Sequence, residues 1–466
     1  MHVLLPFTGP RHIIAPRTVP WPPRVDAAPW HPMILLSLPS RIFYGWLVVA
    51  ALATILFLSA GLGFYSLGVF ITPFEEEFGW SRGQVSIGIA LATTTSGLLG
   101  PVVGVAVSRV GARAVLATGA VGMGICFALL GLTWSLPYLY AMFVLMAAWR
   151  AGLMIVPVAQ VVANWFQRRR GLAIGAATTG IGFGGLVMAP LSKVLISSIG
   201  WRPTFFILGL VIVVVGLPLT LMVIRERPSD RGLHPDGLTP MDPPSRTQLA
   251  PRPPDPATEV WPASQAIRTG AFILATSAIS LGFASMGAVL LHTSPFMEDR
   301  GLAPEMAGLV LGFVAGIGIL GKVGSGYLAD RAAPPLVLAA MFLMETVGLI
   351  ALITITGTVG VTVFVLVFGY SMGAVVALQP LVLVHYFGIR SIATTLGAMT
   401  AFSALFTALG PVFAGIMHDW LGDYTLAYLI FAGINCLAAL LVLLIRPPRV
   451  RDRAEPSALG SPAGVT

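Results

Sequence analysis

Three ionisable residues lie deep inside apolar stretches of the chain: Arg150, Lys322 and Glu345. A charge at the centre of a bilayer costs about 2.5–3.5 kcal/mol even on the mildest scale, so each residue needs a partner or a water-filled cavity. A cation in such a cavity could bind an anionic substrate. A cation outside one could donate to backbone carbonyls of a neighbouring helix, and the sequence leaves both interpretations of Arg150 open.

Two patterns typical of soluble nucleotide-binding enzymes share one apolar stretch. Gly316, Gly318 and Gly321 match the dinucleotide fingerprint, and the segment up to Lys322 matches GxxxxGK, but Val323 replaces the magnesium-binding Ser or Thr. Neither pattern follows a strand of a βαβ unit. We interpret these glycines as small residues that permit close helix contact, and expect no enzyme, cofactor or metal site.

The composition is that of a chain embedded mostly in lipid. Of its 466 residues, 56% are hydrophobic and 10% are charged, and the mean hydropathy is +0.88. Soluble domains carry about 25% charged residues. The net charge of +8 comes from residues spread through short loops and tails, which argues against nucleic-acid binding. Cys126 and Cys436 lie in apolar runs, where inert thiols are expected.

Twelve apolar stretches are long enough to cross a hydrocarbon layer of about 30 Å as helices. They cover residues 44–71, 84–107, 113–133, 137–163, 171–197, 203–224, 268–292, 305–328, 335–356, 358–384, 391–417 and 424–445. With both tails in the cytoplasm, 21 Lys and Arg residues lie on the cytoplasmic side and 4 lie opposite. This bias predicts a multi-pass protein of the inner (plasma) membrane with both termini cytoplasmic.

The two halves of the chain resemble each other at a nearly constant offset. Segment 73–79 matches segment 295–301 at an offset of 222 residues. Further matches keep the same order: Gly104 with Gly326, Arg109 with Arg331, Phe166 with Phe387, and Pro190 with Pro411. Such an internal repeat predicts two copies of one membrane unit.

The predicted organisation follows from the spans and the repeat. A disordered Pro-rich tail (1–40) precedes a six-helix bundle (41–224), a polar cytoplasmic linker (225–266), a second six-helix bundle (267–446) and a cytoplasmic tail (447–466). Prolines such as Pro243 and Pro253 prevent a long helix in the linker.

Two loop sequences carry a family resemblance. The segment from Gly104 to Arg109 and the segment from Gly326 to Arg331 resemble the gating loop signature of the major facilitator superfamily. Asp330 is present in the second copy, whereas Ser108 replaces the usual Asp in the first. The resemblance spans residues 41–446 and implies an all-α fold of twelve helices in two pseudo-symmetric bundles.

A second resemblance concerns one branch of that superfamily. The segment before span five is similar to the entry of that span in bacterial monocarboxylate and oxalate/formate antiporter-type carriers. It contains Trp165-Phe166 followed by Arg168, Arg169 and Arg170. Gly45-Trp46, which opens span one, is also similar to that branch.

The resemblance implies roles for the buried cations. Span four lines the central cavity of the superfamily, which would place Arg150 there. In the branch, an Arg four residues before the signature glycine binds substrate carboxylate, and the matching residue here is Lys322. Lys keeps the charge but lacks the planar fork of Arg.

Two departures from the pattern of proton-coupled members leave the coupling ion of this chain open. Proton-coupled members carry an acid at the position of Gly318, and a lysine in span one at that of Tyr65. Exchange is therefore as plausible as proton symport. Lys322 and Glu345 lie at similar depths in consecutive spans, so a purely structural ion pair between them is an alternative to substrate binding.

Other polar residues on spans expected to face the cavity are further candidates for substrate binding: Tyr65, Gln160, His292, Tyr370 and Gln379. Helix packing is the alternative role for each. We expect a monomeric secondary transporter, embedded in the lipid bilayer, that moves small organic anions by alternating access, with H⁺ or a counter-anion as the coupling species. The alternatives are an efflux carrier for amphipathic or neutral compounds and a non-transporting membrane sensor.

Overall fold

The structure is a computed structural model that describes residues 43–237, 262–301, 304–355 and 357–447. The predicted N-terminal tail, most of the linker and nearly all of the C-terminal tail lie outside the described residues. Within them the chain is helical and contains no strand.

The first half runs from α1 to α9, with short π and 3-10 turns. Its elements are α1 Tyr44–Ala60, η1 Gly61–Tyr65, η2 Leu67–Phe70, α2 Ile71–Phe78, α3 Arg82–Leu98, α4 Gly100–Val110, α5 Ala112–Leu129, η3 Leu130–Leu132, α6 Leu136–Ala151, α7 Ile155–Trp165, α8 Arg170–Ile199, α9 Trp201–Pro218 and η4 Leu219–Val223.

The linker and the second half follow. Their elements are η5 Pro228–Arg231, η6 Pro235–Gly237, α10 Ala263–Ala266, α11 Gly270–Asp299, α12 Pro304–Ala329, α13 Pro334–Thr354, α14 Gly357–Phe387, α15 Ile392–Leu421 and α16 Thr425–Leu443.

The helices are long and apolar enough to confirm the predicted spans. Eleven continuous stretches qualify, and α3 with α4 makes a twelfth if this pair, bent by 44°, is one span. Pro101, near the start of α4, cannot donate a backbone hydrogen bond to the preceding turn, which explains the bend. The first span is longer than predicted, because it continues through η1 and η2 to Phe78.

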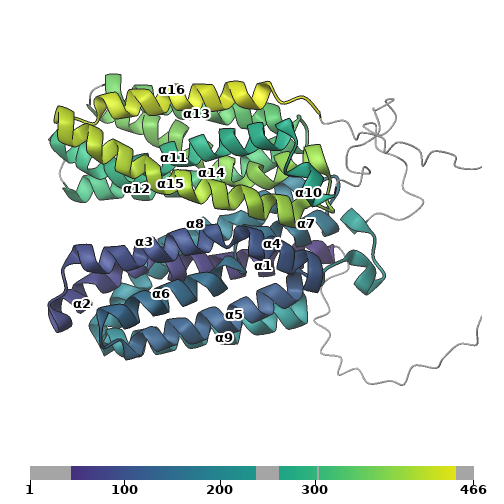
Figure 1. The fold of residues 1–466 in the computed structure, drawn as a ribbon, viewed down its shortest axis with the longest axis horizontal. Coiled ribbons are helices and arrows are strands. Elements are labelled where there is room, and N and C mark those ends of the chain that lie inside the picture. The colour runs from purple at the N-terminus through teal and green to yellow at the C-terminus, as the bar shows by residue number, and fades with distance from the viewer. Residues whose placement is uncertain (1–42, 238–261, 302–303, 356, 448–466) are drawn as a thin grey trace, which may run out of the picture. The chain divides into compact units, whose positions relative to one another are not determined.

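The packing of the helices shows the predicted duplication (Figure 1). In the first half α1 packs on α8, α5 on α9, and α3 on α6. In the second half the corresponding pairs are α11 with α15, α13 with α16, and α12 with α14. Both α8 and α15 are 30-residue helices with an interior proline, Pro190 and Pro411. The predicted architecture of two pseudo-symmetric six-helix bundles is therefore confirmed.

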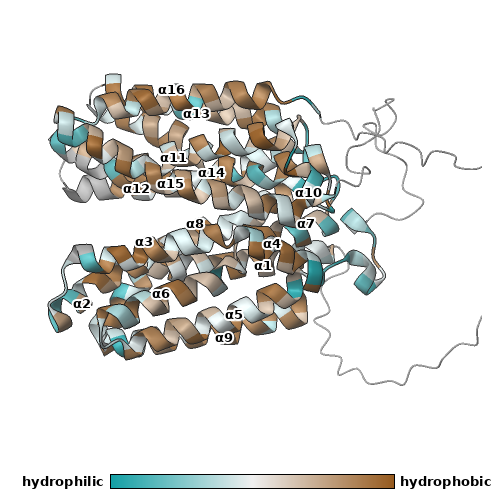
Figure 2. Cartoon of the chain, in the orientation of Figure 1, coloured by the Kyte–Doolittle hydropathy of each residue, from teal (hydrophilic) through white to brown (hydrophobic). Residues whose placement is uncertain are grey.

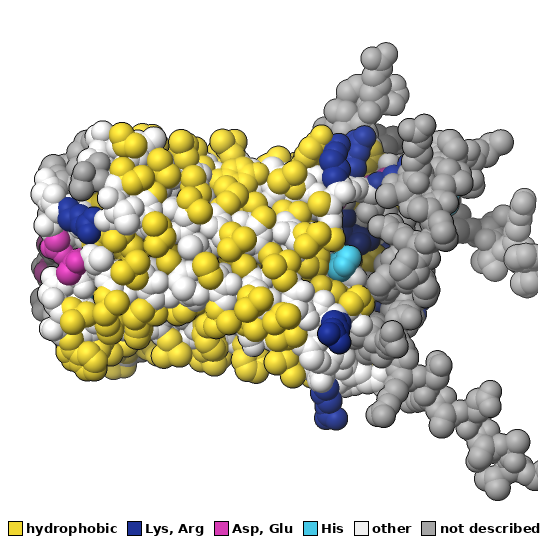
Figure 3. Space-filling view, turned by 90° about the horizontal axis from the view of Figure 1, so that it is seen from above, with side chains coloured by type: hydrophobic (Ala, Val, Ile, Leu, Met, Phe, Trp, Pro, Cys, Tyr) yellow, Lys and Arg dark blue, Asp and Glu magenta, His cyan; other side chains and the backbone are white. Residues whose placement is uncertain are grey.

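Charged side chains gather at the two ends of the helices. Hydrophobic residues predominate along the helices between them (Figure 2). In the space-filling view a broad apolar surface separates one end rich in Lys and Arg from the other (Figure 3). We call the end that carries Arg225–Gly237 the linker end. An apolar band with charged ends is the surface expected of a protein that crosses a lipid bilayer.

The two halves meet through glycines near the linker end. A side chain at Gly171 of α8 would collide with the carbonyl oxygen of Gly326 of α12. Gly100 of α4 and Gly397 of α15 approach each other in the same way. Without side chains at these positions the backbones pack directly, so the halves are closed against each other at the linker end.

The described part of the linker folds back onto the first half. The indole Nε1 of Trp165 donates to the Arg225 carbonyl (2.7 Å), and the Asn164 amide donates to the Glu226 carbonyl (3.0 Å). The Tyr44 hydroxyl donates to the Val223 carbonyl (2.7 Å). These partly buried bonds fix the path of the chain where it leaves the first bundle.

The close backbone contact predicts a large effect of one methyl group. Gly326→Ala should destabilise the closed conformation by about 1–3 kcal/mol, because the facing backbone must move. Gly312→Ala, on the same helix with nothing within 4 Å, is the matched control and should be neutral or slightly stabilising. Thermal unfolding of the purified proteins measures both, and equal Tm values would contradict the packing.

Candidate functional site

Arg150 lies where two irregular spans meet. It is in the last turn of α6, is 5% exposed, and is followed by a break at Gly152–Met154 before α7 begins. The aliphatic part of its side chain packs against Gly63 in the π-turn η1, where any side chain would collide with it. Breaks and π-turns within spans are common at functional sites, because they redirect side chains and free backbone groups.

Among the described residues the guanidinium of Arg150 has no anionic partner. Its Nε is buried without a hydrogen-bond partner, and no described acidic side chain forms an ion pair with it. A buried cation without a counter-ion is costly, so the site favours an anion from outside the chain.

Lys322 lies at the interface between the two halves. It is 5% exposed, and its backbone carbonyl faces Gly175 of α8, where no side chain would fit. Its ammonium bends back along α12 and donates to the Gly318 carbonyl at 3.5 Å, a long hydrogen bond. That contact leaves most of the donor capacity of the ammonium unused.

Lys322 and Glu345 form no ion pair within the described part of the chain. Glu345 is 1% exposed, and its Oε2 has no hydrogen-bond partner. Helix α14 packs extensively on both α12 and α13, whereas α12 and α13 make few contacts with each other. The structural pairing considered from the sequence is therefore absent, because α14 lies between the two residues.

Two predicted tyrosines lie beside glycines of neighbouring helices. Tyr65 is 40% exposed, and its ring lies on Gly185 of α8. The Tyr370 hydroxyl on α14 lies against Gly324 of α12, near the Lys322 turn. Both phenols lie on helices that also contact the buried cations.

The remaining candidates take part in packing. His292 uses both ring nitrogens, one with the Tyr424 hydroxyl (3.2 Å) and one with the Pro411 carbonyl (2.9 Å). Gln160 donates to Asn164 (3.2 Å), which in turn holds the linker. Gln379 is buried, with 3% of its surface exposed, directly before Pro380 in α14.

The second gating motif joins the two halves by hydrogen bonds. The Asp330 carboxylate, just after α12, accepts from the backbone N–H groups of Gly171 (2.6 Å) and Leu172 (2.9 Å). These groups belong to the first turn of α8, where a carboxylate also interacts favourably with the helix dipole. Asp330 therefore acts as a cap supplied by the opposite half.

Burial raises the pKa of Asp330 above its ordinary value. The two N–H groups and the charge of Arg170 act in the opposite direction, and the Asp236 carboxylate adds to the rise. The two capping N–H groups therefore offset part of the cost of burying this carboxylate at the linker end.

The first gating motif lacks the corresponding cap. Gly104 packs against the Ala393 carbonyl of α15, as Gly326 packs against α8. The Ser108 hydroxyl, however, donates to Val105 in its own helix (2.8 Å). The substitution noted in the sequence thus removes a hydrogen-bonded clamp from one of two equivalent positions.

The remaining arginines of the motifs bind locally. The Arg331 guanidinium lies 3.4 Å from the ring centre of Tyr327 and donates to its carbonyl (3.3 Å). Arg170 donates to the Phe166 carbonyl (3.0 Å). Arg109, in the last turn of α4, and Arg169, directly before α8, lie at the linker end.

The family model described as Major Facilitator Superfamily matches residues 52–406. The chain belongs to the Major Facilitator Superfamily. It is therefore a multi-pass membrane transporter and not an enzyme, as predicted.

Curated relatives match this facilitator along most of its length. Monocarboxylate transporter 11 of Mus musculus is 30% identical over 405 residues, covering 83% of this chain and 84% of the relative. Monocarboxylate transporter 13 of Bos taurus is 27% identical over 417 residues, covering 87% and 89%. The crystal structure of a variant of the E. coli fucose:proton symporter FucP matches with a TM-score of 0.65 and 14% identity, over 87% of this chain and 100% of that one. This structural likeness shows the fold.

Two of the three glycines of the α12 pattern, Gly318 and Gly321, are packing positions, as interpreted from the sequence; for Gly316 the interpretation was wrong, because nothing lies within 4 Å of a side chain built there. Gly318 and Gly321 face the backbone of α14 at Gly373 and Tyr370, inside continuous helices. A further enzyme-like pattern escaped the sequence analysis, because Gly369 to Gly373 matches the GxSxG nucleophile motif. Ser371 at its centre donates to Val367 in its own helix (2.8 Å), so this match too lies within a helix.

Sequence reasoning also missed the contact made by Asp236. Its Oδ2 accepts from the backbone N–H groups of Gln167 (2.9 Å) and Arg168 (2.8 Å), while its φ of 58° is left-handed. The Asp-Gly sequence at 236–237 was the available signal, since both residues tolerate such turns.

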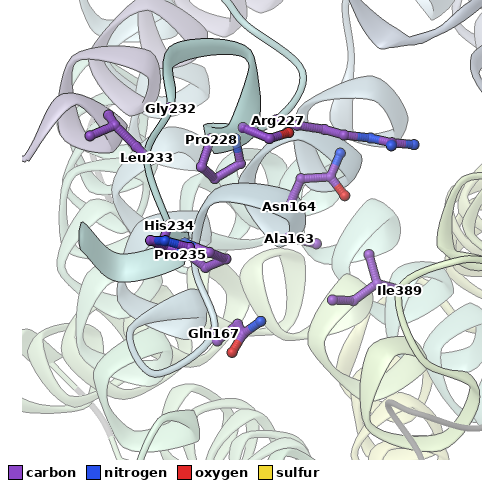
Figure 4. Close-up of a pocket in the computed structure, with 11 residues that line it drawn as sticks. Ala163, Asn164, Gln167, Arg227, Pro228, Gly232, Leu233, His234, Pro235 and Ile389 are labelled. Atoms are coloured by element: carbon purple, nitrogen blue, oxygen red, sulfur yellow. The ribbon is translucent and has the colours of Figure 1, made fainter. Parts of the chain in front are cut away.

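A cavity opens beside these linker turns. It has a volume of about 460 Å³ and is lined by the end of α7, the linker and Ile389 of the second half (Figure 4). Asn164, Arg227 and His234 are among its polar side chains. The linker and both halves therefore meet at this end of the transporter.

Among the described residues, no group of three or more His, Cys, Asp or Glu side chains is placed to hold a metal ion. Cys126 is buried, Cys436 is exposed, and both are free thiols.

The asymmetric gate predicts opposite effects of two substitutions. Asp330→Asn should loosen the linker end, whereas Ser108→Asp should tighten it by accepting from the N–H groups of Ala393 and Thr394. Gly104 meets Ala393 and Thr394 as Gly326 meets Gly171 and Leu172, which makes these residues equivalent. Both effects follow from capping, which contributes about 0.5–2 kcal/mol.

Alkylation of a buried cysteine measures both effects. Thr178 is fully buried on the α8 face that carries Gly171 and Gly175, so Thr178→Cys reports on opening. With Cys126 and Cys436 replaced by Ala, Asp330→Asn should raise the alkylation rate several-fold and Ser108→Asp should lower it. Unchanged rates in both variants would contradict the proposed asymmetry.

Proposed function

We propose that this facilitator carries small organic anions, monocarboxylates among them, by alternating access. The observation that supports this most directly is the pair of buried cations, Arg150 in the first half and Lys322 in the second, without acidic partners among the described residues. A carboxylate is the ligand that best compensates such groups. The names of the curated relatives, monocarboxylate transporters, agree with this substrate class.

The position of Lys322 supports alternating access. Its turn of α12 contacts α8 of the other half at Gly175, so relative movement of the halves changes its surroundings. The conformation described here is closed at the linker end. We assign that end to the cytoplasm of an inner membrane, since the excess of Lys and Arg there follows the positive-inside rule.

Substrate binding is assigned first to Lys322 and Arg150. Tyr65 and Tyr370 are proposed to contact the substrate, because their hydroxyl-bearing rings lie on helices that contact the cations. Gln379 is a weaker candidate, and Gln160 and His292 already bond to protein groups that hold the linker and the helix packing.

Removal of either cation tests the proposal. Lys322→Ala and Arg150→Ala should each reduce counterflow of labelled lactate and oxalate in proteoliposomes at least tenfold, because the anion loses its compensating charge. The matched control is Lys193→Ala, which removes an exposed lysine of α8 and should leave transport unchanged.

Protein amount and folding must be compared in the same vesicles. Normal counterflow by both cation variants would refute the site. Loss of transport with normal Tm and normal reconstitution would support it.

A further inference from the structure

Glu345 is a buried acid to which the proposed transport cycle has so far given no role. Among the side chains that the structure describes, the buried charged ones are Arg150, Lys322 and Glu345. Glu345 lies near the middle of α13, a helix that packs mainly on α14 and α16.

Contacts of the neighbouring turns show where Glu345 points. Phe342 packs against Gly282 of α11, and Gly348 packs against Phe368 of α14. Residues 342, 345 and 348 are spaced by three and form one stripe of the helix. Glu345 therefore faces the groove between α11 and α14, toward the inside of the second bundle.

The antiparallel pairing of α13 and α14 gives the position of Glu345 along the axis of α14. Since Gly348 meets Phe368, Glu345 lies level with Ser371. On the opposite side of α14, Gly373 meets the Gly318 carbonyl, which also accepts the hydrogen bond from the Lys322 ammonium. The carboxyl and the ammonium thus lie at nearly the same depth on opposite sides of α14.

Helix α14 carries three small residues at this level, beside Tyr370 and Met372, whose side chains lie against α12. Gly369, Ser371 and Gly373 present little or no side chain, and Ser371 bonds back to its own helix. The two charged groups are therefore separated by about one helix diameter, on the order of 10 Å. That distance is too long for an ion pair but short enough for electrostatic coupling.

Burial without a cation favours the neutral form of Glu345. Its Oε2 has no hydrogen-bond partner, and it forms no ion pair with any described residue. Asn435, a buried amide on the adjoining helix α16, donates to Ser285 (3.2 Å) and brings no positive charge in either orientation. An ionised carboxylate would be uncompensated here, so this conformation holds a protonated carboxyl.

Electrostatics links this proton to the anion. A free Lys322 ammonium opposes protonation of Glu345, and an anion bound at Lys322 cancels that effect. At about 10 Å and an effective dielectric constant of about 20, the effect is roughly tenfold in a binding constant. By reciprocity, protonation of Glu345 strengthens anion binding by the same factor.

We propose that Glu345 is the proton-binding site of this carrier and that it couples proton binding to anion binding at Lys322 across α14. The step is carboxylate plus H⁺ giving carboxylic acid, so one monoanion and one proton move together without net charge. This inference rests on the proposed function and supplies the acid that is absent at Gly318.

The helices around Glu345 carry other titratable groups. They are Lys322 on α12, Tyr370, His385 and Tyr386 on α14, Tyr428 and Cys436 on α16, and His292 on α11. Of these, Lys322 is the one that carries a fixed positive charge at the level of Glu345.

The test compares wild type, Glu345→Gln and a control in proteoliposomes that contain a trapped pH-sensitive dye. Wild type should take up protons with lactate, and its half-saturating lactate concentration should rise about tenfold as Glu345 deprotonates at high pH. Glu345→Gln, which mimics the protonated side chain, should keep lactate counterflow but lose proton uptake and this pH dependence. Thr346→Val, which removes the neighbouring hydroxyl bonded to Ala432 (3.1 Å), should behave as wild type.

Each outcome bears on the inference. Proton uptake or unchanged pH dependence in Glu345→Gln would overturn it, as would lactate movement without protons in wild type. Absence of lactate counterflow in wild type would instead refute the proposed function.

Infrared spectroscopy covers the case in which Glu345→Gln does not fold. At a pH high enough to deprotonate Glu345 in the absence of lactate, wild-type protein titrated with lactate should gain a protonated-carboxyl band as Lys322 is neutralised. Lack of any lactate-dependent carboxyl band would overturn the inference.

Discussion

Charge enclosed among lipid-embedded helices must be compensated, and this constraint governs the interior of the transporter. Arg150 and Lys322 are each buried to 5% exposure, and neither has an acidic partner among the described residues. Most polar side chains of the described spans bond to the backbone or to one another, so these two cations stand out. An anion that enters between the halves would compensate these charges, which is why we propose an organic anion as the substrate.

The close approach of the two halves depends on residues without side chains. Gly171 with Gly326 and Gly100 with Gly397 allow backbone contact across the interface at the linker end. Such contacts are short-ranged and involve few polar bonds, so they can separate at modest cost. The Asp330 cap adds a directional bond on one side of the interface, and its absence at Ser108 makes the closure asymmetric.

Helix α14 connects the chemistry of the second half. It packs on α12, which carries Lys322, and on α13, which carries Glu345, so a helix of roughly 10 Å diameter lies between the two residues. Opposite charges at that distance influence each other without neutralising each other. The arrangement therefore allows a proton and an anion to bind at separate positions and still affect each other's binding.

The sequence by itself determined the twelve spans, the duplication, the superfamily and the unusual burial of Arg150, Lys322 and Glu345. Hydropathy, repeat offset and loop motifs are local properties, so they survive without knowledge of how helices rotate and pack. Only the tertiary structure decided which residues pack against or hydrogen-bond to one another. It showed that α14 lies between Lys322 and Glu345, that His292 bonds to Tyr424 and Pro411, and that Asp236 holds the α7–α8 turn. These contacts depend on which face each helix presents to its neighbours, and spacing along one chain does not specify that.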